Sequence, residues 1–368
     1  MCDVILRNSE AEQYICAARK NFILKNELSE SMSKILICHF SDIHGDVDRF
    51  DNVMKLIEYY KPEFAVHTGD LTVWNSSDNT DFFFQKIDSI AVPVYNAIGN
   101  HETFDNNGSL TNEYLYSRYI APLKNINCNT EKGWYYTDFE SRKIRLIVLN
   151  PYEYFHERYN IRCTMSFLQE QCEWVADTLK GASEKNYAVI IAAHEFAEKI
   201  PAGANDFGFC QRFMPHPWGM PRERKPNYII EDIVDAFKHG KALKKEYICD
   251  LSGETISIDC NFDNCGEFIC YLGGHYHGDY VGYLPSHNDQ LSITMTCSGC
   301  FPPNYHNIGD ECSDLPRIPG TISEDAVNFY VIDRENKKIS IIRVGAAVND
   351  LMEKRIVLTL PYEAERRR

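Results

Sequence analysis

Short apolar runs that end abruptly in polar residues constrain the fold of this 368-residue chain more than any other feature. Residues 35–40, 64–67 and 92–98 form such runs, and Asp or Asn follows each within three positions. The pattern recurs at 144–149 and 188–193. Predominantly apolar runs of this length are typical of strands that are buried on both faces of a sheet. The sequence therefore predicts a sheet whose strands end in polar side chains.

Segments with helical periodicity alternate with these runs. Residues 48–60 carry apolar side chains at spacings of three and four, and 167–179 and 228–239 show the same pattern. We interpret Asp46 and Asp48 as capping residues of the first helix rather than as part of a site. Alternation of strands and helices predicts an α/β fold. Later strands are expected at 268–272 and 291–296, followed by a hairpin that joins 327–332 to 339–344.

The net charge of −15 and the 14 cysteines limit the class of protein. An excess of acidic residues argues against binding of duplex nucleic acid, which favours clustered Lys and Arg. No run approaches the roughly 18 apolar residues that a membrane helix needs, and residues 1–34 lack the apolar core of a secretory signal. We therefore expect a cytoplasmic protein, not bound to a membrane, whose cysteines are free thiols.

The amino-acid composition of the chain changes after His194. Residues 200–227 are rich in Pro, Gly, aromatic and basic residues, so we interpret 196–270 as an insertion or cap. The predicted organisation is an N-terminal extension at 1–33, a main domain at 34–345 that contains this insertion, and a C-terminal tail at 346–368.

Polar residues with metal-binding side chains follow five of the predicted strands. In an open α/β sheet, residues at the carboxyl ends of neighbouring strands converge even when they are distant in sequence. Imidazole suits Zn, Fe, Co or Ni, whereas carboxylate and amide oxygens suit Mn and Mg. Each motif alone is more often a turn or a helix cap, but a chance origin of all five together is improbable. The motifs are Asp42-Ile43-His44, Gly69-Asp70, Gly99-Asn100-His101-Glu102, His194 and Gly274-His275-Tyr276-His277.

In order and spacing these motifs resemble those of the calcineurin-like metallophosphoesterase family, over about residues 35–345 apart from the insertion. The resemblance implies a four-layer α/β/β/α sandwich of two mixed sheets. It also implies two divalent metal ions, of which Mn, Fe, Zn and Ni are candidates. Purple acid phosphatases of this family place a tyrosine three residues after the bridging aspartate, where this chain has Val73. A tyrosinate-bound ferric ion is therefore not expected.

The resemblance also assigns roles to the motif residues. It implies that Asp70 bridges the two metals and that His101 protonates the leaving oxygen, oriented by Glu102. The implied ligands of one metal are Asp42, His44 and His277, and those of the other are Asn100, His194 and His275.

The function implied is hydrolysis of a phosphate monoester or diester by a metal-bridged hydroxide, as a phosphatase or a phosphodiesterase. The acidic charge favours a small or mid-sized phosphorylated substrate, such as a metabolite, nucleotide or peptide. The alternative is a metal-binding scaffold that engages a partner protein through 196–270 after losing turnover, but the chain lacks none of the motif residues.

Residues outside the motifs carry weaker signals. Arg212, His216, Trp218 and Arg222 mix cations with aromatic rings and are candidates for substrate binding, although an irregular solvated loop explains them as well. The Cys297–Cys300 pair has the spacing of a zinc knuckle but no second tight pair, so we expect buried thiols there. His67 lies within a predicted strand, and we expect it to pack against a neighbouring strand rather than to bind metal.

Overall fold

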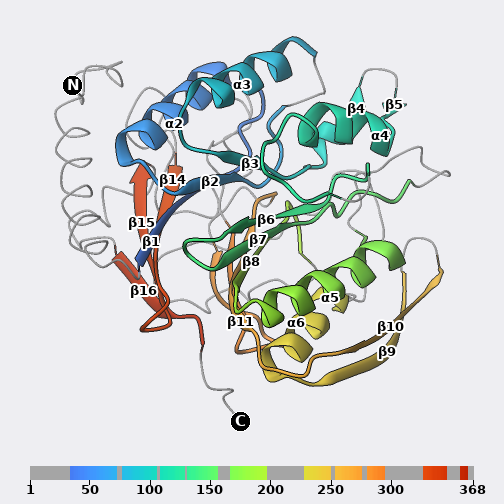
Figure 1. The fold of residues 1–368 in the computed structure, drawn as a ribbon. Coiled ribbons are helices and arrows are strands. Elements are labelled where there is room, and N and C mark those ends of the chain that lie inside the picture. The colour runs from blue at the N-terminus through green and yellow to red at the C-terminus, as the bar shows by residue number, and fades with distance from the viewer. Residues whose placement is uncertain are drawn as a thin grey trace.

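The computed structural model describes residues 34–72, 77–105, 108–128, 131–155, 166–196, 228–249, 253–275, 280–294, 326–345 and 357–363. In these segments, two six-stranded sheets face each other and helices cover their outer faces (Figure 1). The predicted extension at 1–33 lies outside the described residues, as do residues 197–227 and 250–252 of the predicted cap, His277, the Cys297–Cys300 pair and the four candidate substrate residues.

The first sheet combines a parallel half with an antiparallel half. Its strands β1, β2 and β3 are parallel, and the strands from β14 to β16 are antiparallel neighbours. Residues expected in the C-terminal tail form its edge strand, β16. The order across the sheet is β16 (Val357–Pro361), β15 (Lys338–Gly345), β14 (Ala326–Asp333), β1 (Lys34–Phe40), β2 (Phe64–His67) and β3 (Val94–Asn96).

The second sheet has a parallel centre and an antiparallel strand at each edge. Its four central strands are parallel, so their carboxyl ends lie along one edge. The edge strands β12 and β6 run the other way. The order is β12 (Tyr280–Tyr283), β13 (Leu291–Thr294), β11 (Glu267–Gly273), β8 (Ala188–Ala192), β7 (Ile144–Val148) and β6 (Tyr135–Phe139).

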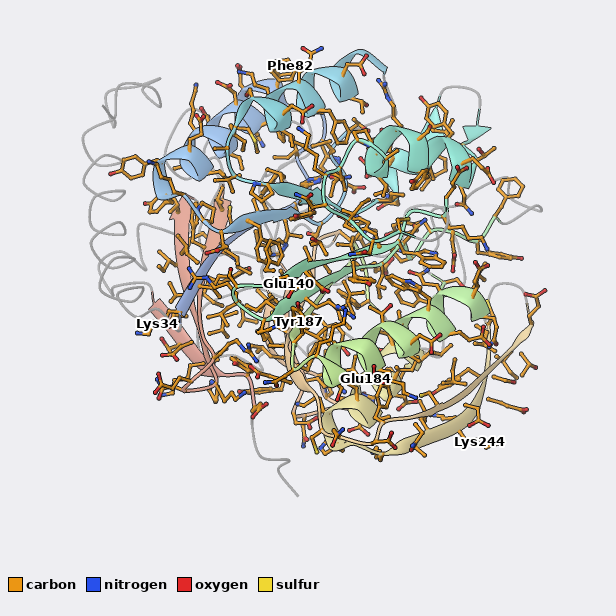
Figure 2. All side chains as sticks on the ribbon, viewed as in Figure 1. Lys34, Phe82, Glu140, Glu184, Tyr187 and Lys244 are labelled. Atoms are coloured by element: carbon orange, nitrogen blue, oxygen red, sulfur yellow. The ribbon has the colours of Figure 1, made fainter. Side chains whose placement is uncertain are left out.

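Alternation of side chains along the buried strands produces separate apolar layers. On β1, Ile35 and Ile37 join the core between the sheets, whereas Leu36 and Cys38 face the opposite way, toward α2 (Val47–Tyr60). Side chains fill the space between the two sheets and the space between each sheet and its helices (Figure 2). Full burial of one large aliphatic side chain contributes about 1.5–3 kcal/mol, which explains why these strands are apolar on both faces. This period-two alternation builds the sandwich.

Helices complete the four layers. The first sheet is covered by α2 and α3 (Ser77–Ser89), and the second by α5 (Gln169–Glu184) and α6 (Ile229–His239) (Figure 1). Asp46 caps α2 as predicted, because its carboxylate accepts a hydrogen bond of 3.0 Å from the Arg49 backbone N–H. The predicted α/β/β/α sandwich of two mixed sheets is confirmed.

The described part of the predicted insertion packs on the outer side of the second sheet. After α6, the strands β9 (Ala242–Ile248) and β10 (Thr255–Asn261) form an antiparallel ribbon. Ile256 and Ile258 of this ribbon join the apolar layer of α5 and α6. These segments therefore thicken the helical layer.

Short elements connect β3 to β6. They are a 3-10 turn (His101–Thr103), β4 (Phe104–Asp105), β5 (Gly108–Ser109), α4 (Asn112–Leu115) and a π-helical turn (Tyr116–Ile120).

The cysteines of the described segments are free thiols, and several of them, such as Cys38 and Cys270, are buried. Across those same segments, no helix is both long and apolar enough to span a membrane.

Candidate metal centre

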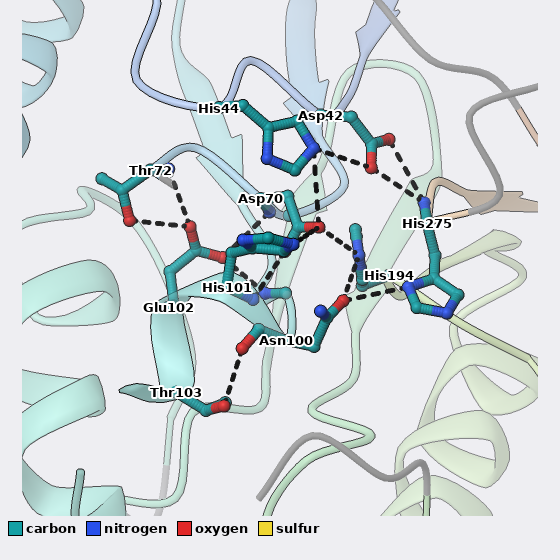
Figure 3. Close-up of polar contacts among 12 residues, drawn as sticks. Asp42, His44, Asp70, Thr72, Asn100, His101, Glu102, Thr103, His194 and His275 are labelled. Carbon is teal, nitrogen blue, oxygen red and sulfur yellow. Dashed lines mark hydrogen bonds and ion pairs between the residues drawn. The ribbon is translucent and has the colours of Figure 1, made fainter. Parts of the chain in front are cut away.

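The predicted motif residues meet at the carboxyl ends of the parallel strands (Figure 3). The first sheet supplies three loops, which follow β1, β2 and β3, and the second sheet supplies the loops after β8 and β11. Because the two sheets face each other, the five loops converge on one cluster. It contains Asp42, His44, Asp70, Asn100, His101, His194 and His275.

Four of the clustered residues have a left-handed backbone. The φ angles are 56° at Asp42, 51° at His44, 56° at Asp70 and 74° at His275. Non-glycine residues in this region cost on the order of 1–3 kcal/mol each, and such strain concentrates at functional sites. Backbone hydrogen bonds hold these residues in the left-handed conformation. The Asp42 N–H donates to Gly69 O at 3.0 Å, and the His44 N–H donates to Asp70 O at 2.9 Å.

Two glycines allow the loops to approach closely. Gly69 has a φ of +100°, and a Cβ there would lie 2.6 Å from Nδ1 of His194. A Cβ at Gly99 would lie 2.2 Å from Oδ1 of Asp70. Both distances are too short for real atoms, so a side chain at either position would push the ligand-bearing loops apart. The glycines of the Gly-Asp and Gly-Asn-His motifs thus make space for the cluster.

Asp70 lies at the centre of the cluster. Its Oδ2 is 3.0 Å from Nε2 of His194, 3.8 Å from Nε2 of His44 and 3.9 Å from Nε2 of His101. Two groups of potential ligands share this carboxylate, and the ligand atoms within each group lie within 4.8 Å of one another. One group is His44, Asp70 and His101, and the other is Asp70, His194 and His275.

Asp42 and Asn100 add oxygen atoms on either side of Asp70. Oδ1 of Asp42 is 3.8 Å from Nε2 of His44, and the carboxylate accepts from the backbone N–H of His275 at 3.1 and 3.2 Å. Oδ1 of Asn100 lies 3.1 Å from Nε2 of His194 and 2.9 Å from Nδ1 of His275. Asp42 and His44 thus lie on one side of Asp70, and Asn100, His194 and His275 lie on the other.

The charges of the cluster depend strongly on one another. Burial alone would raise the pKa of Asp70, but the nearby His194 and His101 outweigh it and lower that pKa well below its usual range. Burial would lower the pKa of His194, yet Asp70 raises it to about 9. Burial lowers the pKa of His275 to about 4, so this imidazole is neutral at pH 7. An ionised carboxylate among imidazoles is the charge state that metal binding requires.

The donor set fits a divalent metal of intermediate softness. It offers imidazole nitrogens, carboxylate oxygens and one amide oxygen, and it contains no thiolate. The orientation of His194 also fits, because its Nδ1 lies 2.6 Å from the Thr68 carbonyl oxygen. A proton on Nδ1 satisfies that carbonyl, so Nε2, which faces Asp70 and Asn100, is the nitrogen that would bind a metal after giving up its own proton.

Glu102 holds together the loops that follow β2 and β3. Its buried carboxylate accepts hydrogen bonds from the backbone N–H groups of Gly99 at 2.7 Å, Asp70 at 2.9 Å and Thr72 at 3.0 Å. Burial and the charge of Asp70 raise the pKa of Glu102 to about 7. These bonds tie the loop after β2 to the loop after β3, so Glu102 shapes the backbone around Asp70.

His101 is a partly exposed member of the cluster. Its backbone N–H donates to Oδ1 of Asp70 at 2.9 Å, and its ring packs edge-on against His44 with 4.6 Å between centroids. The side chain retains 17% of its exposure, compared with 2% for His44. This position leaves the imidazole open to a bound molecule.

Two further residues near the cluster escaped the sequence analysis, namely Tyr152 and Glu195. Glu195 follows His194 directly, and its carboxylate accepts from the Tyr152 hydroxyl at 3.4 Å. The adjacency of Glu195 to the motif residue His194 was a signal in the sequence, whereas nothing in the sequence marks Tyr152. His67 packs as predicted, with Nδ1 at 2.5 Å from Oδ1 of Asn96 on the neighbouring strand.

Comparisons with known proteins agree with this geometry. Residues 35–204 match the family model described as calcineurin-like phosphoesterase. The Dictyostelium discoideum protein named sphingomyelinase phosphodiesterase C is 29% identical over 175 residues, which cover 42% of this chain but only 38% of that protein. The crystal structure of a dimetal phosphatase from Danio rerio superposes with a TM-score of 0.54 at 11% identity, covering 89% of this chain and 99% of that chain. At such low identity, the structural similarity establishes the fold alone.

Proposed function

Because residues 35–204 of this chain match the calcineurin-like phosphoesterase model, we propose that it hydrolyses phosphate esters with two divalent metal ions held by the strand-end cluster. This match supports the predicted class, a phosphoric ester hydrolase. The observation that carries the two-metal proposal is the position of Asp70, whose carboxylate belongs to both groups of potential ligands. A carboxylate shared in this way suits a bridging ligand.

The proposed ligand sets follow the two sides of the cluster. Asp42 and His44 hold one metal, together with the predicted ligand His277, which lies outside the described residues. Asn100, His194 and His275 hold the other. Mn, Fe, Zn and Ni all suit these donors. When bound, such a pair supplies positive charge to the phosphate oxygens and lowers the pKa of the attacking water.

The protein's own residues then position the substrate and move one proton. We assign His101 as the general acid that protonates the leaving oxygen, because its imidazole is partly exposed and adjoins both Asp70 and His44. Asp70 orients it through the hydrogen bond from the His101 backbone N–H. Glu102 contributes indirectly, by fixing the backbone of Gly99 and Asp70.

For the substrate, we propose a small or mid-sized phosphodiester. The Dictyostelium relative is named both a sphingomyelinase and a phosphodiesterase, which favours a diester over a monoester for this chain. The net charge of −15 disfavours duplex nucleic acid. The predicted substrate residues Arg212, His216, Trp218 and Arg222 lie outside the described segments, and their role stays a prediction.

We further propose a cytoplasmic location. Buried free thiols such as Cys172 and Cys249 are typical of proteins kept in a reducing compartment. Separation of a tagged protein into cytosolic and secreted fractions tests this, and recovery from the secreted fraction would contradict it.

A metal-dependent hydrolysis screen tests the function. Bis-p-nitrophenyl phosphate and p-nitrophenyl phosphate are offered to the purified chain with Mn²⁺, Ni²⁺, Zn²⁺ or Mg²⁺, before and after chelation. We expect activity that is lost with chelator, returns with metal and is higher on the diester. Metal binding without turnover of either ester would favour the predicted alternative, a metal-binding scaffold.

A substitution separates the two roles open to His101. If it is the general acid, His101→Ala retains two metal ions per chain and loses about 10²–10⁴-fold in rate. Loss of one metal ion from this variant would make His101 a ligand instead. His239→Ala serves as a control, because His239 lies on α6, away from the strand ends.

A further inference from the structure

Tyr152 and Glu195 form a pair beside the two imidazoles that the second sheet supplies. Tyr152 is fully buried in the loop after β7, and its ring lies 6.0 Å from that of His194, between centroids. Its hydroxyl donates to Oε2 of Glu195 at 3.4 Å. The same carboxylate oxygen lies 3.8 Å from Nε2 of His275. One buried hydroxyl is thus linked through one carboxylate to a candidate metal ligand.

The two ring nitrogens of His275 face different surroundings. Nδ1 lies 2.9 Å from Oδ1 of Asn100, inside the cluster, and Figure 3 shows the other ring nitrogen directed away from it. That outer nitrogen, Nε2, is the one that faces Glu195. His194 has the same arrangement with the nitrogens exchanged, because its Nδ1 contacts the Thr68 carbonyl and its Nε2 faces the cluster.

The position of one proton decides whether His275 can bind a metal. A neutral imidazole carries its proton on one nitrogen, and only the other nitrogen has a lone pair for a metal. Asn100 Oδ1 is an acceptor 2.9 Å from Nδ1, so it favours a proton on that inner nitrogen. A carboxylate beside Nε2 favours the opposite tautomer, which leaves Nδ1 free for the metal.

We propose that Glu195, held by the Tyr152 hydroxyl, is a positioning residue that keeps the proton of His275 on Nε2 and directs Nδ1 toward the metal of the Asn100–His194–His275 side. This inference rests on the proposed two-metal function and extends it to residues outside the motifs. Tyr152 acts indirectly, because its hydroxyl fixes the Glu195 carboxylate by a hydrogen bond while its ring packs near His194.

Titration of the metal-free 368-residue chain with Co²⁺ tests the proposal, because cobalt reports both affinity and ligand geometry through its visible absorption. For Glu195→Ala, we expect the dissociation constant of one of the two sites to rise about 10–100-fold, the usual effect of losing a residue that supports a metal ligand. The absorption band of that site should change as well. Glu195→Gln should lose less, since its amide oxygen can take the place of the carboxylate oxygen beside Nε2, and Tyr152→Phe should lose least.

A matched pair elsewhere in the molecule provides the control. The Tyr362 hydroxyl donates to Oε1 of Glu267 at 2.7 Å, and Glu267 begins β11 at the opposite end from His275. Tyr362→Phe therefore removes the same kind of hydrogen bond without touching the cluster. Urea unfolding of every variant shows whether it is folded, and Glu195→Gln, which keeps the shape of the side chain, gives a second measurement if Glu195→Ala unfolds.

The outcomes separate this inference from the function on which it rests. Two cobalt sites in the wild type, with one weakened in the Glu195 variants but not in Tyr362→Phe, would support both. Two cobalt sites of unchanged affinity and spectrum in the Glu195 and Tyr152 variants would overturn the positioning role alone. A wild-type protein that binds no cobalt would overturn the two-metal function together with this inference.

Discussion

The strand-end cluster around Asp70 and a second cluster on α6 contain the same residue types, but their charges are balanced differently. On α6, Asp235 and His239 lie one turn apart and meet Asp289, with one ligand atom from each within 4.8 Å of the others. By donor type alone, this second cluster is also a candidate metal site. The comparison therefore shows what distinguishes a metal centre from a structural group of charges.

The α6 cluster already contains its cations. Lys241 Nζ lies 2.5 Å from Oδ2 of Asp235, and Lys238 Nζ lies 3.3 Å from Oδ2 of Asp289. By contrast, the ion pairs of Asp70 within the described residues are all with imidazoles. An imidazole can exchange its proton for a metal near neutral pH, whereas an ammonium group keeps its proton. Donor type and the nature of the neighbouring cations must therefore be considered together.

The largest expected effect comes from removing one carboxylate charge in each cluster. Asp70→Asn should lower metal-dependent hydrolysis by more than about 100-fold, because even residues that only support a metal ligand contribute 10–100-fold. Asp235→Asn should leave the rate of hydrolysis within about twofold, since Asp235 belongs to the α6 cluster and not to the strand-end cluster. Initial rates on bis-p-nitrophenyl phosphate check both. Equal rates for the two variants would remove the distinction between the clusters.

A second prediction concerns Glu102, whose carboxylate accepts hydrogen bonds from three backbone N–H groups. Glu102→Gln should lower the free energy of unfolding by about 2–4 kcal/mol, because one amide oxygen replaces two acceptors and its NH₂ group faces buried donors. Urea unfolding measures the change. As a control, Glu170→Gln alters a carboxylate that is 52% exposed and should change the free energy by less than about 0.5 kcal/mol. A Glu102→Gln protein as stable as this control would contradict the supporting role.

The smallest effect is expected near the second cluster, at Asp232 of α6. Burial would raise the pKa of Asp232, but hydrogen bonds from His287, Lys245 and Tyr247 outweigh it and lower this pKa below its usual range. A depressed pKa stabilises the fold above the unfolded value of about 3.9, and this stabilisation is lost as the pH falls below that value. Tyr247→Phe removes a hydrogen bond of 2.6 Å to this carboxylate.

We therefore expect Tyr247→Phe to lower the free energy of unfolding by about 1.5 kcal/mol at pH 7, as for hydrogen bonds to charged groups. The difference from the wild type should shrink as the pH falls through about 4, where Asp232 begins to lose its charge in the unfolded chain. Urea unfolding at pH 7, 5 and 3 measures this trend. A difference that grows toward pH 3 would show that Asp232 is not the partner that matters.

The same comparison explains how much the sequence could predict. Asp42, Asp70 and His194 each follow an apolar run, so their position at strand ends was predictable from the pattern alone. That five strands belong to two facing sheets was not, because apolar runs do not reveal which strands pair. The four-layer arrangement came from the family resemblance. The pairing of β8 with β7 and β11, which brings His194 and His275 together, is a tertiary property.

Other features were readable but missed, or not readable at all. Ile256 and Ile258 alternate with polar residues in β10, a strand signal that a prediction of a cap obscured. The lysines of β9 hide a strand because its exposed face tolerates charge. The contact between Tyr152 and Glu195 joins residues 43 positions apart, and it depends on how two loops pack. Local patterns therefore located the residues of the strand-end cluster better than the residues that support them.

Anomalous X-ray diffraction from crystals grown with Zn²⁺ or Mn²⁺ would locate the bound metal ions and so decide whether Asp70 is shared by two of them. We expect two metal peaks about 3.5–4 Å apart with the Asp70 carboxylate between them, and none among Asp235, His239 and Asp289. A single peak at Asp70, or a peak at the α6 cluster with none at Asp70, would contradict this expectation.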